Sequence, residues 1–347
     1  MARESADELL AELSAIRADA GSPAGREVLE RALASKASVL VARAAEIVAA
    51  AEVVGLGEQL AAAFFRFMPE RAPGEPSASE PFAAARRGRK DEPADRGCAA
   101  KTALAKALYT LGDAAGAEVF LQGIRHVQNE APFTPKPFDA AAELRGTCAL
   151  GLVRLAHRDA LTEAADLLMD GSPAARIGGA RALAYSGREE AAPPLRVKLL
   201  AGDADAEVMG ECFTALLSLT PARGVRFVAR FLDADEGDVA DAAALALGES
   251  RRPEAFELLR AHWERAPADP ARRRPMLLAL GLLRRPEAIE LLLSVVRDGA
   301  DPAACDAVEA LALYRHDPAV KQRIENTIQQ RGSATLRRAY DRAFGEA

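Results

Sequence analysis

The sequence predicts an all-α protein built from stacked helical hairpins, an α-solenoid. A short segment beginning with Ala-Leu recurs seven times, and after a longer first interval the starts lie about 32 residues apart, a period typical of helical repeats. A second apolar helical pattern follows each of these segments. Aromatic residues make up only 5% of the chain and alanine dominates, which favours closely packed helices over sheets. The recurring segments start at Ala107, Ala149, Ala182, Ala215, Ala244, Ala279 and Ala310.

Helix boundaries are visible in the sequence. Four dipeptides combine a capping side chain with proline at the first helical position, where its missing N–H has no intrahelical partner. They are Ser172-Pro173, Thr220-Pro221, Asp301-Pro302 and Asp317-Pro318. Gly112 and Gly187 can end helices in the left-handed conformation. No segment has the pattern of a strand, so we expect almost no sheet.

These boundaries divide the chain into about eight hairpins. We place them at 25–68, 95–130, 139–171, 172–203, 204–236, 237–269, 270–300 and 301–332, with amphipathic caps at 3–19 and 334–345. The predicted organisation is a capping helix and first hairpin in 1–68, a flexible insertion in 69–97, a repeat array in 98–332 and a capping helix in 333–347. Polar outer faces on the caps prevent open-ended association, so we expect a monomer.

The stretch SPAARIGGARALAYSGREEAAPPLRVKLL, from Ser172 to Leu200, shows the whole repeat: a capped start, an arginine, small residues, a glycine turn and a second helix. It resembles HEAT repeats, in particular the short bacterial HEAT-like repeats also found in bilin lyases. The resemblance covers residues 95–332 well and 25–68 more loosely, and the whole chain resembles bacterial HEAT-repeat proteins of unassigned function. It implies a right-handed superhelix whose concave face binds extended partners.

Charge and cysteine usage restrict the class of protein. The net charge is -6 with a pI near 5.5, which argues against a general nucleic-acid binder. Cys98, Cys148, Cys212 and Cys305 form no CxxC pair and no Cys/His cluster, so we expect reduced, packed thiols. The charged N-terminus has no apolar signal region, and no run is long enough to span a membrane. We therefore expect a cytoplasmic protein that binds neither nucleic acid nor membrane.

Two insertions interrupt the period. Pro69 to Gly97 is rich in Pro, Gly, Ser and charge, and Ala131 to Phe138 (APFTPKPF) contains three prolines. Both follow the second helix of one hairpin and precede the first helix of the next, which predicts that they share an edge of the solenoid. Insertions gathered on one edge often mark a binding surface.

Candidate contact residues surround these insertions: Lys101, His126, Gln128, Glu130, Asp139, Glu143 and Arg145. His126 and Glu130 are expected to share a face at the end of one helix, and Asp139 and Glu143 to begin the next. Each has a structural alternative. Acids near a helix start interact with its dipole, a single histidine often serves as a hydrogen-bonded interface residue, and Phe133 and Phe138 can fix the loop to the helices.

Arginine-rich segments occur elsewhere. RRGRK, Arg86 to Lys90, could contact phosphate or a membrane surface, but the acids that follow cancel much of its charge, so we expect a solvated, disordered segment. RRPEA occurs twice, from Arg251 and from Arg284, and predicts either salt bridges within the array or a site for an acidic partner.

No nucleotide-binding, metalloprotease or nucleophile motif is present, so we assign no catalytic, cofactor or metal residue. Our hypothesis is a non-enzymatic scaffold that binds a protein partner through its concave face and the loop-bearing edge at 123–146. The alternative, from the resemblance, is a lyase-like or chaperone-like protein that handles a prosthetic group such as a bilin on a partner. A purely structural spacer is the third possibility.

Overall fold

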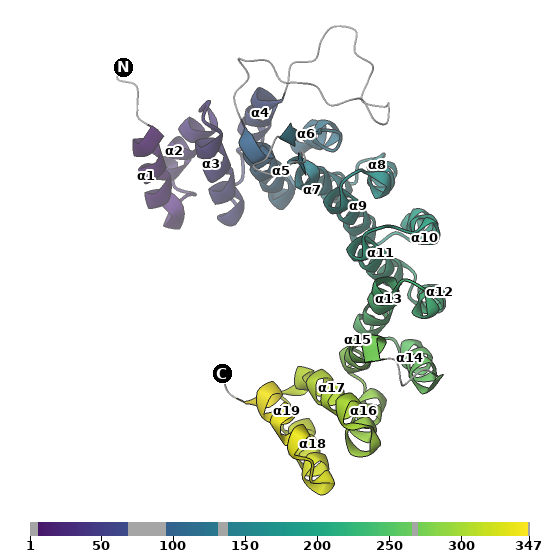
Figure 1. The fold of residues 1–347 in the computed structure, drawn as a ribbon. Coiled ribbons are helices and arrows are strands. Elements are labelled where there is room, and N and C mark those ends of the chain that lie inside the picture. The colour runs from purple at the N-terminus through teal and green to yellow at the C-terminus, as the bar shows by residue number, and fades with distance from the viewer. Residues whose placement is uncertain (1–5, 69–94, 131–137, 266–269, 346–347) are drawn as a thin grey trace. The chain divides into compact units, whose positions relative to one another are not determined.

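The computed structural model describes residues 6–68, 95–130, 138–265 and 270–345. These residues form helical hairpins joined by short turns (Figure 1), and the predicted all-α solenoid class is confirmed. The described ranges contain nineteen α-helices and one two-stranded ladder. The chain forms two compact units, Met1–Ser186 and Gly187–Ala347.

The first unit contains α1 to α9, and alternate helices form two layers. Helices α3, α5, α7 and α9 contact one another in order, while α4, α6 and α8 lie against them as the second helix of each hairpin. The helices are α1 (Ala6–Ala15), α2 (Pro23–Leu33), α3 (Ser38–Ala50), α4 (Gly57–Phe67), α5 (Ala99–Leu111), α6 (Gly116–Gly123), α7 (Ala142–Arg154), α8 (Ala160–Asp166) and α9 (Pro173–Tyr185).

The second unit repeats this arrangement. Helices α11, α13, α15, α17 and α19 form one layer, and α10, α12, α14, α16 and α18 form the other. The helices are α10 (Ala192–Ala201), α11 (Ala206–Leu219), α12 (Pro221–Val228), α13 (Gly237–Glu249), α14 (Pro253–Arg265), α15 (Pro270–Leu282), α16 (Pro286–Asp298), α17 (Asp301–Leu311), α18 (Pro318–Arg331) and α19 (Ala334–Phe344).

The hairpins predicted from residue 95 onward each contain two helices, as expected. The count is wrong in 25–68, where three helices, α2, α3 and α4, replace the predicted pair. The missed break lies between Leu33 and Ser38 and contains neither proline nor glycine, so no local signal marks it. Instead, Arg66 on α4 donates to the carbonyl oxygens of Leu33 and Ser35, at 2.9 and 2.8 Å. This long-range contact supplies a hydrogen-bond donor to carbonyl oxygens at the C-terminal end of α2, which have no partner within the helix.

The predicted helix caps are only partly correct. The Asp317 carboxylate accepts hydrogen bonds from the Ala319 and Val320 backbone N–H groups, as predicted. Ser172 and Thr220 occupy N-cap positions, but their side chains make no capping bond. Helix α17 begins at Asp301 itself. Proline at the first turn is thus the more reliable boundary signal, because it needs no partner.

Several hairpin turns place one residue in the left-handed region. Gly112 and Gly187 do so as predicted, with φ of 63° at both. Arg251 and Arg284, the first residues of the two RRPEA turns, take the same conformation at φ 51° although they carry Cβ atoms. Local salt bridges join the next arginine to the glutamate of the turn in both, as Arg252–Glu254 (3.9 Å) and Arg285–Glu287 (3.5 Å).

Helices α7 and α9 of the first unit approach each other closely at two glycines. A Cβ atom added to Gly178 would lie 2.5 Å from the Gly146 Cα, and one added to Gly146 would lie 3.0 Å from the Gly178 Cα. Only glycine on both helices permits this approach. It brings the start of α7 close to the turn before α9, where the candidate site lies.

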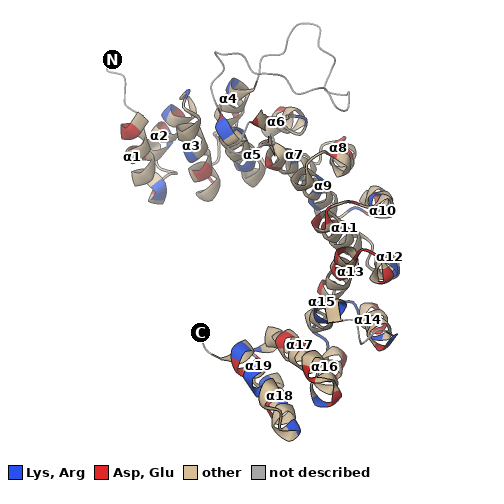
Figure 2. Ribbon diagram, in the orientation of Figure 1, with Lys and Arg blue, Asp and Glu red and all other residues tan. Residues whose placement is uncertain are grey.

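The four cysteines are free thiols. Cys98, Cys148 and Cys212 are buried, which confirms the prediction of packed thiols for these three, whereas Cys305 is partly exposed. Burial raises the pKa of the Cys98 thiol to about 12. Basic and acidic side chains are interspersed along the described helices (Figure 2). Among the described residues, no helix combines the length and apolar character needed to cross a membrane.

Candidate functional site

The described ends of the two insertions lie side by side, as the sequence predicts. The Gly97 backbone N–H donates to Glu130 Oε1 at 2.7 Å, and Gln128 Nε2 donates to the Asp95 carbonyl at 2.7 Å. Gln128 Nε2 also donates to Glu130 Oε1 at 2.6 Å. The described end of the first insertion is therefore hydrogen-bonded to the segment before the second. Most of both insertions, including RRGRK and Phe133, lies outside the described residues.

A short antiparallel ladder closes the second insertion. Strand β1 (Asn129–Glu130) pairs with β2 (Phe138–Asp139), with Glu130 opposite Phe138. The expectation that His126 and Glu130 share a helical face is wrong, because α6 ends at Gly123 and Glu130 lies in β1. Asp139 likewise precedes α7 instead of beginning it. The chain after Gly123 leaves the helix, and its strand β1 pairs with β2. This pairing supplies hydrogen-bond partners for backbone groups that no longer have helical ones.

Asp139 fixes the junction between the ladder and α7. Its Oδ1 accepts the backbone N–H groups of Gln128 and Ala141, both at 3.0 Å, and its Oδ2 lies 2.6 Å from Arg145 Nη1. Burial opposes ionisation, but these hydrogen bonds and the guanidinium hold the pKa of Asp139 below its usual value. Asp139 therefore carries a fixed charge that orients the start of α7.

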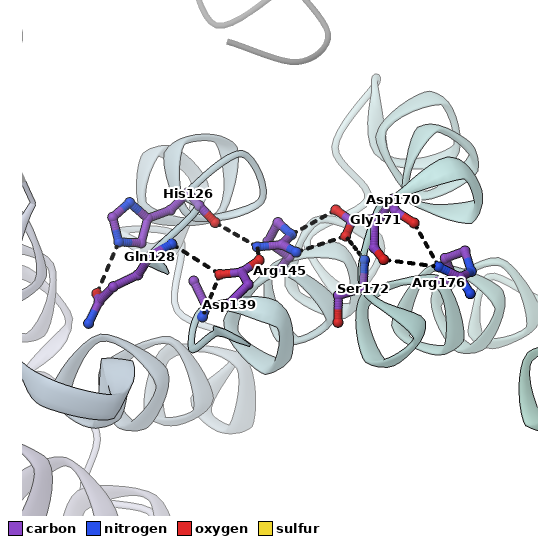
Figure 3. Close-up of polar contacts among 9 residues, drawn as sticks. His126, Gln128, Asp139, Arg145, Asp170, Gly171, Ser172 and Arg176 are labelled. Atoms are coloured by element: carbon purple, nitrogen blue, oxygen red, sulfur yellow. Dashed lines mark hydrogen bonds and ion pairs between the residues drawn. The ribbon is translucent and has the colours of Figure 1, made fainter. Parts of the chain in front are cut away.

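Arg145 lies at the centre of the site and is only 2% exposed (Figure 3). Its Nε and Nη2 form a two-pronged contact with the Asp170 carboxylate, at 2.9 and 2.8 Å, and Nη1 donates to the His126 carbonyl at 2.9 Å. Burial disfavours its charge, yet Asp170 and Asp139 raise the pKa of Arg145 above its usual value. Arg145 was predicted to contact a partner. It is instead buried, and it links the segments that contain His126, Asp139 and Asp170.

The network continues to the next hairpin through Asp170, which the sequence analysis did not select. Asp170 Oδ1 accepts the Ser172 backbone N–H at 2.8 Å, and Arg176 Nη1 donates to the Asp170 carbonyl at 2.9 Å. Figure 3 shows Asp170 between the two arginines. The signal available in the sequence was the Asp-Gly-Ser-Pro turn, in which an acid two residues before the N-cap can accept a backbone N–H.

Lys101 is also buried, at 3% exposure. Its ammonium lies 3.3 Å from Asp95 Oδ2 and 3.4 Å from the Phe67 carbonyl. The Asp95 carboxylate accepts the Ala100 and Lys101 backbone N–H groups at 2.8 and 3.1 Å, and so caps α5. Sequence reasoning missed Asp95, because it placed this acid within the insertion. Lys101 is thus a structural cation, and its ammonium has no exposed surface to offer a partner.

His126 faces the same interior. Burial is the main reason that the pKa of His126 is lowered, to about 4, and the nearby Lys101 and Arg145 cations act in the same direction. Its Nε2 lies 3.4 Å from Gln128 Oε1, which is part of the hydrogen-bonded frame that holds Glu130. The imidazole is therefore neutral at pH 7, in agreement with the interface role considered for it.

Three side chains project outward around this buried frame. The Glu143 side chain is 67% exposed and pairs with Lys106 on α5. Phe138 is 49% exposed and Val127 is 42% exposed. The expectation that Phe138 fixes the loop to the helices is therefore not met, because half of its surface faces solvent.

The ionisable groups of the site are matched to one another. Lys101 is paired with Asp95, and Arg145 with Asp139 and Asp170. Within the described ranges, no group of three or more His, Cys, Asp or Glu side chains could hold a metal ion. The arrangement stabilises a fixed backbone conformation at the base of both insertions, and its outer surface offers apolar and carboxylate contacts.

Comparison with known proteins gives similarity in the solved structures alone. No family model and no curated protein matches the chain. The chain is similar to an engineered protein (TM-score 0.41, 16% identity, covering 100% of this chain and 97% of that one). It is similar to human deoxyhypusine hydroxylase in complex with glycerol (TM-score 0.31, 18% identity, covering 81% and 91%). It is also similar to the complex of CpcE and CpcF of phycocyanin lyase from Nostoc sp. PCC7120 (TM-score 0.34, 18% identity, covering 77% and 100%).

Proposed function

We propose that the protein is a non-enzymatic HEAT-like scaffold that binds a protein partner through the loop-bearing edge. This edge is defined by Asp95–Gly97 together with residues 123–130 and 138–146, and the adjacent faces of α5 and α7 extend it. The observation that carries the proposal is the hydrogen-bonded joint between the insertions, in which Glu130 accepts the Gly97 N–H and Gln128 donates to the Asp95 carbonyl.

The buried ions support this role because they make the edge rigid. A buried ion pair adds little to net stability compared with apolar packing, but it fixes geometry when every partner is satisfied. Here Arg145 and Lys101 hold the bases of the insertions against α7 and α5. A binding surface that is rigid before association loses less conformational entropy on binding. The exposed Val127, Phe138 and Glu143 then supply the contacts themselves.

Affinity capture from the source cells, followed by binding measurements with the captured protein, tests the proposal. The variant Val127→Ser/Phe138→Ser changes two exposed side chains of the edge, and Val39→Ser/Val54→Ser is its control, because these valines are 69% and 64% exposed elsewhere in the same unit. We expect the edge variant to weaken binding by at least about tenfold, on the scale of two apolar contacts. The control should bind as wild type does.

Equal binding by the edge variant and wild type would show that the partner uses another surface. The prosthetic-group alternative has its own measurement, in which the protein is mixed with a series of bilins. A shift in bilin absorbance that the edge variant abolishes would favour that alternative over a scaffold.

A further inference from the structure

A second charged surface lies in the second unit, on the neighbouring helices α10 and α12. Arg223, Arg226 and Arg230 are spaced three and four residues apart and therefore share one face of α12 and the turn that continues it. All three are exposed. Among the described residues, none of them forms an ion pair, and no acidic residue lies within α12. The first acid after the three arginines, Asp233, pairs with His262 and Arg265 on α14.

The neighbouring α14 provides a contrast. Its half-buried Arg260 pairs with Glu257 at 2.6 Å and with Glu264 at 3.8 Å. On α14, acids of the same helix thus partly neutralise the arginine. On α12 the equivalent acids are missing, so its positive charge is available to a binding partner.

Helix α10 contributes an arginine and an apolar strip to the same surface. Arg196 lies over the Phe227 ring of α12, 4.1 Å from its centroid, and Arg230 lies over that ring at 5.7 Å. Two guanidinium groups are thereby held near one another by a buried aromatic ring, which limits their rotamer freedom. Beside Arg196, Val197 is 66% exposed and Leu200 is 62% exposed.

From this combination we propose that Arg196, Arg223, Arg226 and Arg230, with Val197 and Leu200, form a docking surface for an acidic amphipathic peptide segment of a partner protein. Arginine binds carboxylates through two parallel hydrogen bonds, and a row of arginines over about 10 Å of helix matches acids at helical or alternate-strand spacing. Val197 and Leu200 favour a peptide in which acidic residues alternate with apolar residues such as leucine, because the apolar residues can cover these two side chains. A uniformly anionic polymer would leave them exposed.

A nucleic acid is a poorer fit, because Phe227 is buried beneath arginines and the neighbouring Phe231 ring packs against Phe227 and Phe213, so neither ring is free to stack on a base. The proposal concerns residues other than the loop-bearing edge, so it can fail or succeed without affecting the proposed function.

The test uses the full chain and a fluorescent peptide that repeats Glu-Glu-Leu-Leu, with fluorescence anisotropy as the measurement. We expect binding that weakens as salt is raised, and at least about tenfold weaker binding by Arg223→Glu/Arg226→Glu. The control Arg158→Glu/Arg338→Glu changes the net charge equally at exposed arginines outside the surface and should bind as wild type does. Val197→Ser/Leu200→Ser should also weaken binding, and by more for this peptide than for polyglutamate.

Several outcomes would overturn the inference. These are no binding by the wild-type chain, equal binding by the Arg223/Arg226 variant and its control, or equal loss for polyglutamate when Val197 and Leu200 are replaced. Stronger binding to single-stranded DNA or to vesicles containing phosphatidylserine than to the peptide would assign the surface to a different class of partner. Circular dichroism of each variant shows that the helices remain folded.

Discussion

At Arg145, four oxygen atoms from three residues surround one buried guanidinium. The charge is costly to remove from water, and its partners Asp139 and Asp170 are themselves largely buried. Removal of one partner from such a group leaves the others uncompensated, which is why buried ion pairs are sensitive to substitution even when they add little net stability. Residues of this kind determine geometry more than affinity.

Arg145→Met should therefore destabilise the first unit. We expect a loss of about 3 kcal/mol, because two carboxylates lose their counter-ion. The loss should appear as a lower midpoint in thermal unfolding followed by circular dichroism. Arg158→Met is the matched control, since the Arg158 side chain is 88% exposed and exposed pairs contribute little. Equal midpoints for the two variants would contradict the assigned role.

His126 predicts a dependence of stability on pH. Its pKa is about 4 in the folded chain and 6.5 as the ordinary value, so the unfolded chain binds the proton more readily. The stabilising contribution is present above pH 6.5 and is lost as the pH falls from 6.5 toward 4. By pH 4.5 we expect a loss on the order of 2 kcal/mol.

Urea denaturation at a series of pH values measures this loss. His126→Gln removes this titrating group and should weaken the dependence between pH 6.5 and 4.5, with a remainder from His262, whose pKa burial also lowers. His316→Gln, at an exposed position, should leave it unchanged. If the His126 variant retains the full wild-type dependence, the loss arises from other groups.

At the scale of elements, the approach of α7 to α9 determines whether the site can form. Gly146 and Gly178 allow the two backbones to come together, and this places Arg145 of α7 within reach of Asp170 before α9. The same principle is seen at the joint between the insertions, where the ladder β1–β2 positions Glu130 against Gly97. Local packing of two elements thus creates the polar geometry at their ends.

Gly178→Ala tests this packing. Alanine favours a helix over glycine by about 1 kcal/mol, but the added methyl group would lie 2.5 Å from the Gly146 Cα. We expect a net loss of about 1–3 kcal/mol from the forced separation of the helices. Gly210→Ala in α11 is the control, because its nearest neighbour would be 3.5 Å away, and it should be neutral or stabilising. Chemical denaturation of both variants gives the comparison, and a stabilising Gly178→Ala would contradict the close approach.

At the scale of the whole molecule, the chain tolerates insertions between hairpins because each hairpin contacts mainly its neighbours. Asp95 marks where the first insertion rejoins the folded array, since its carboxylate caps α5 and pairs with Lys101. We expect the insertion before that anchor to affect stability mainly through the entropy of closing the loop, which changes slowly with length.

Replacement of residues 70–94 by a short Gly/Ser linker should therefore change the melting temperature little. Each halving of the loop length lowers the entropic cost of closing the loop by about 0.6 kcal/mol, which slightly stabilises the folded protein. The same replacement combined with Asp95→Ala should lower the melting temperature by several degrees, because Lys101 loses its buried counter-ion. A drop of many degrees with the linker alone would mean that the insertion packs against the array.

The sequence by itself determined the class of fold, the hairpins from residue 95 onward and the edge on which the insertions meet. Those features depend on signals read within a few residues, namely proline after a cap, glycine after a helix and a recurring Ala-Leu segment. Only the tertiary structure decided that Arg145 and Lys101 are buried, that Asp95 and Asp170 are their partners, and that Phe138 faces solvent. Asp170 lies twenty-five residues from Arg145 along the chain, and their pairing depends on how closely α7 and α9 pack. The spatial distance between these two side chains is fixed by packing between helices, and a local sequence pattern does not predict it.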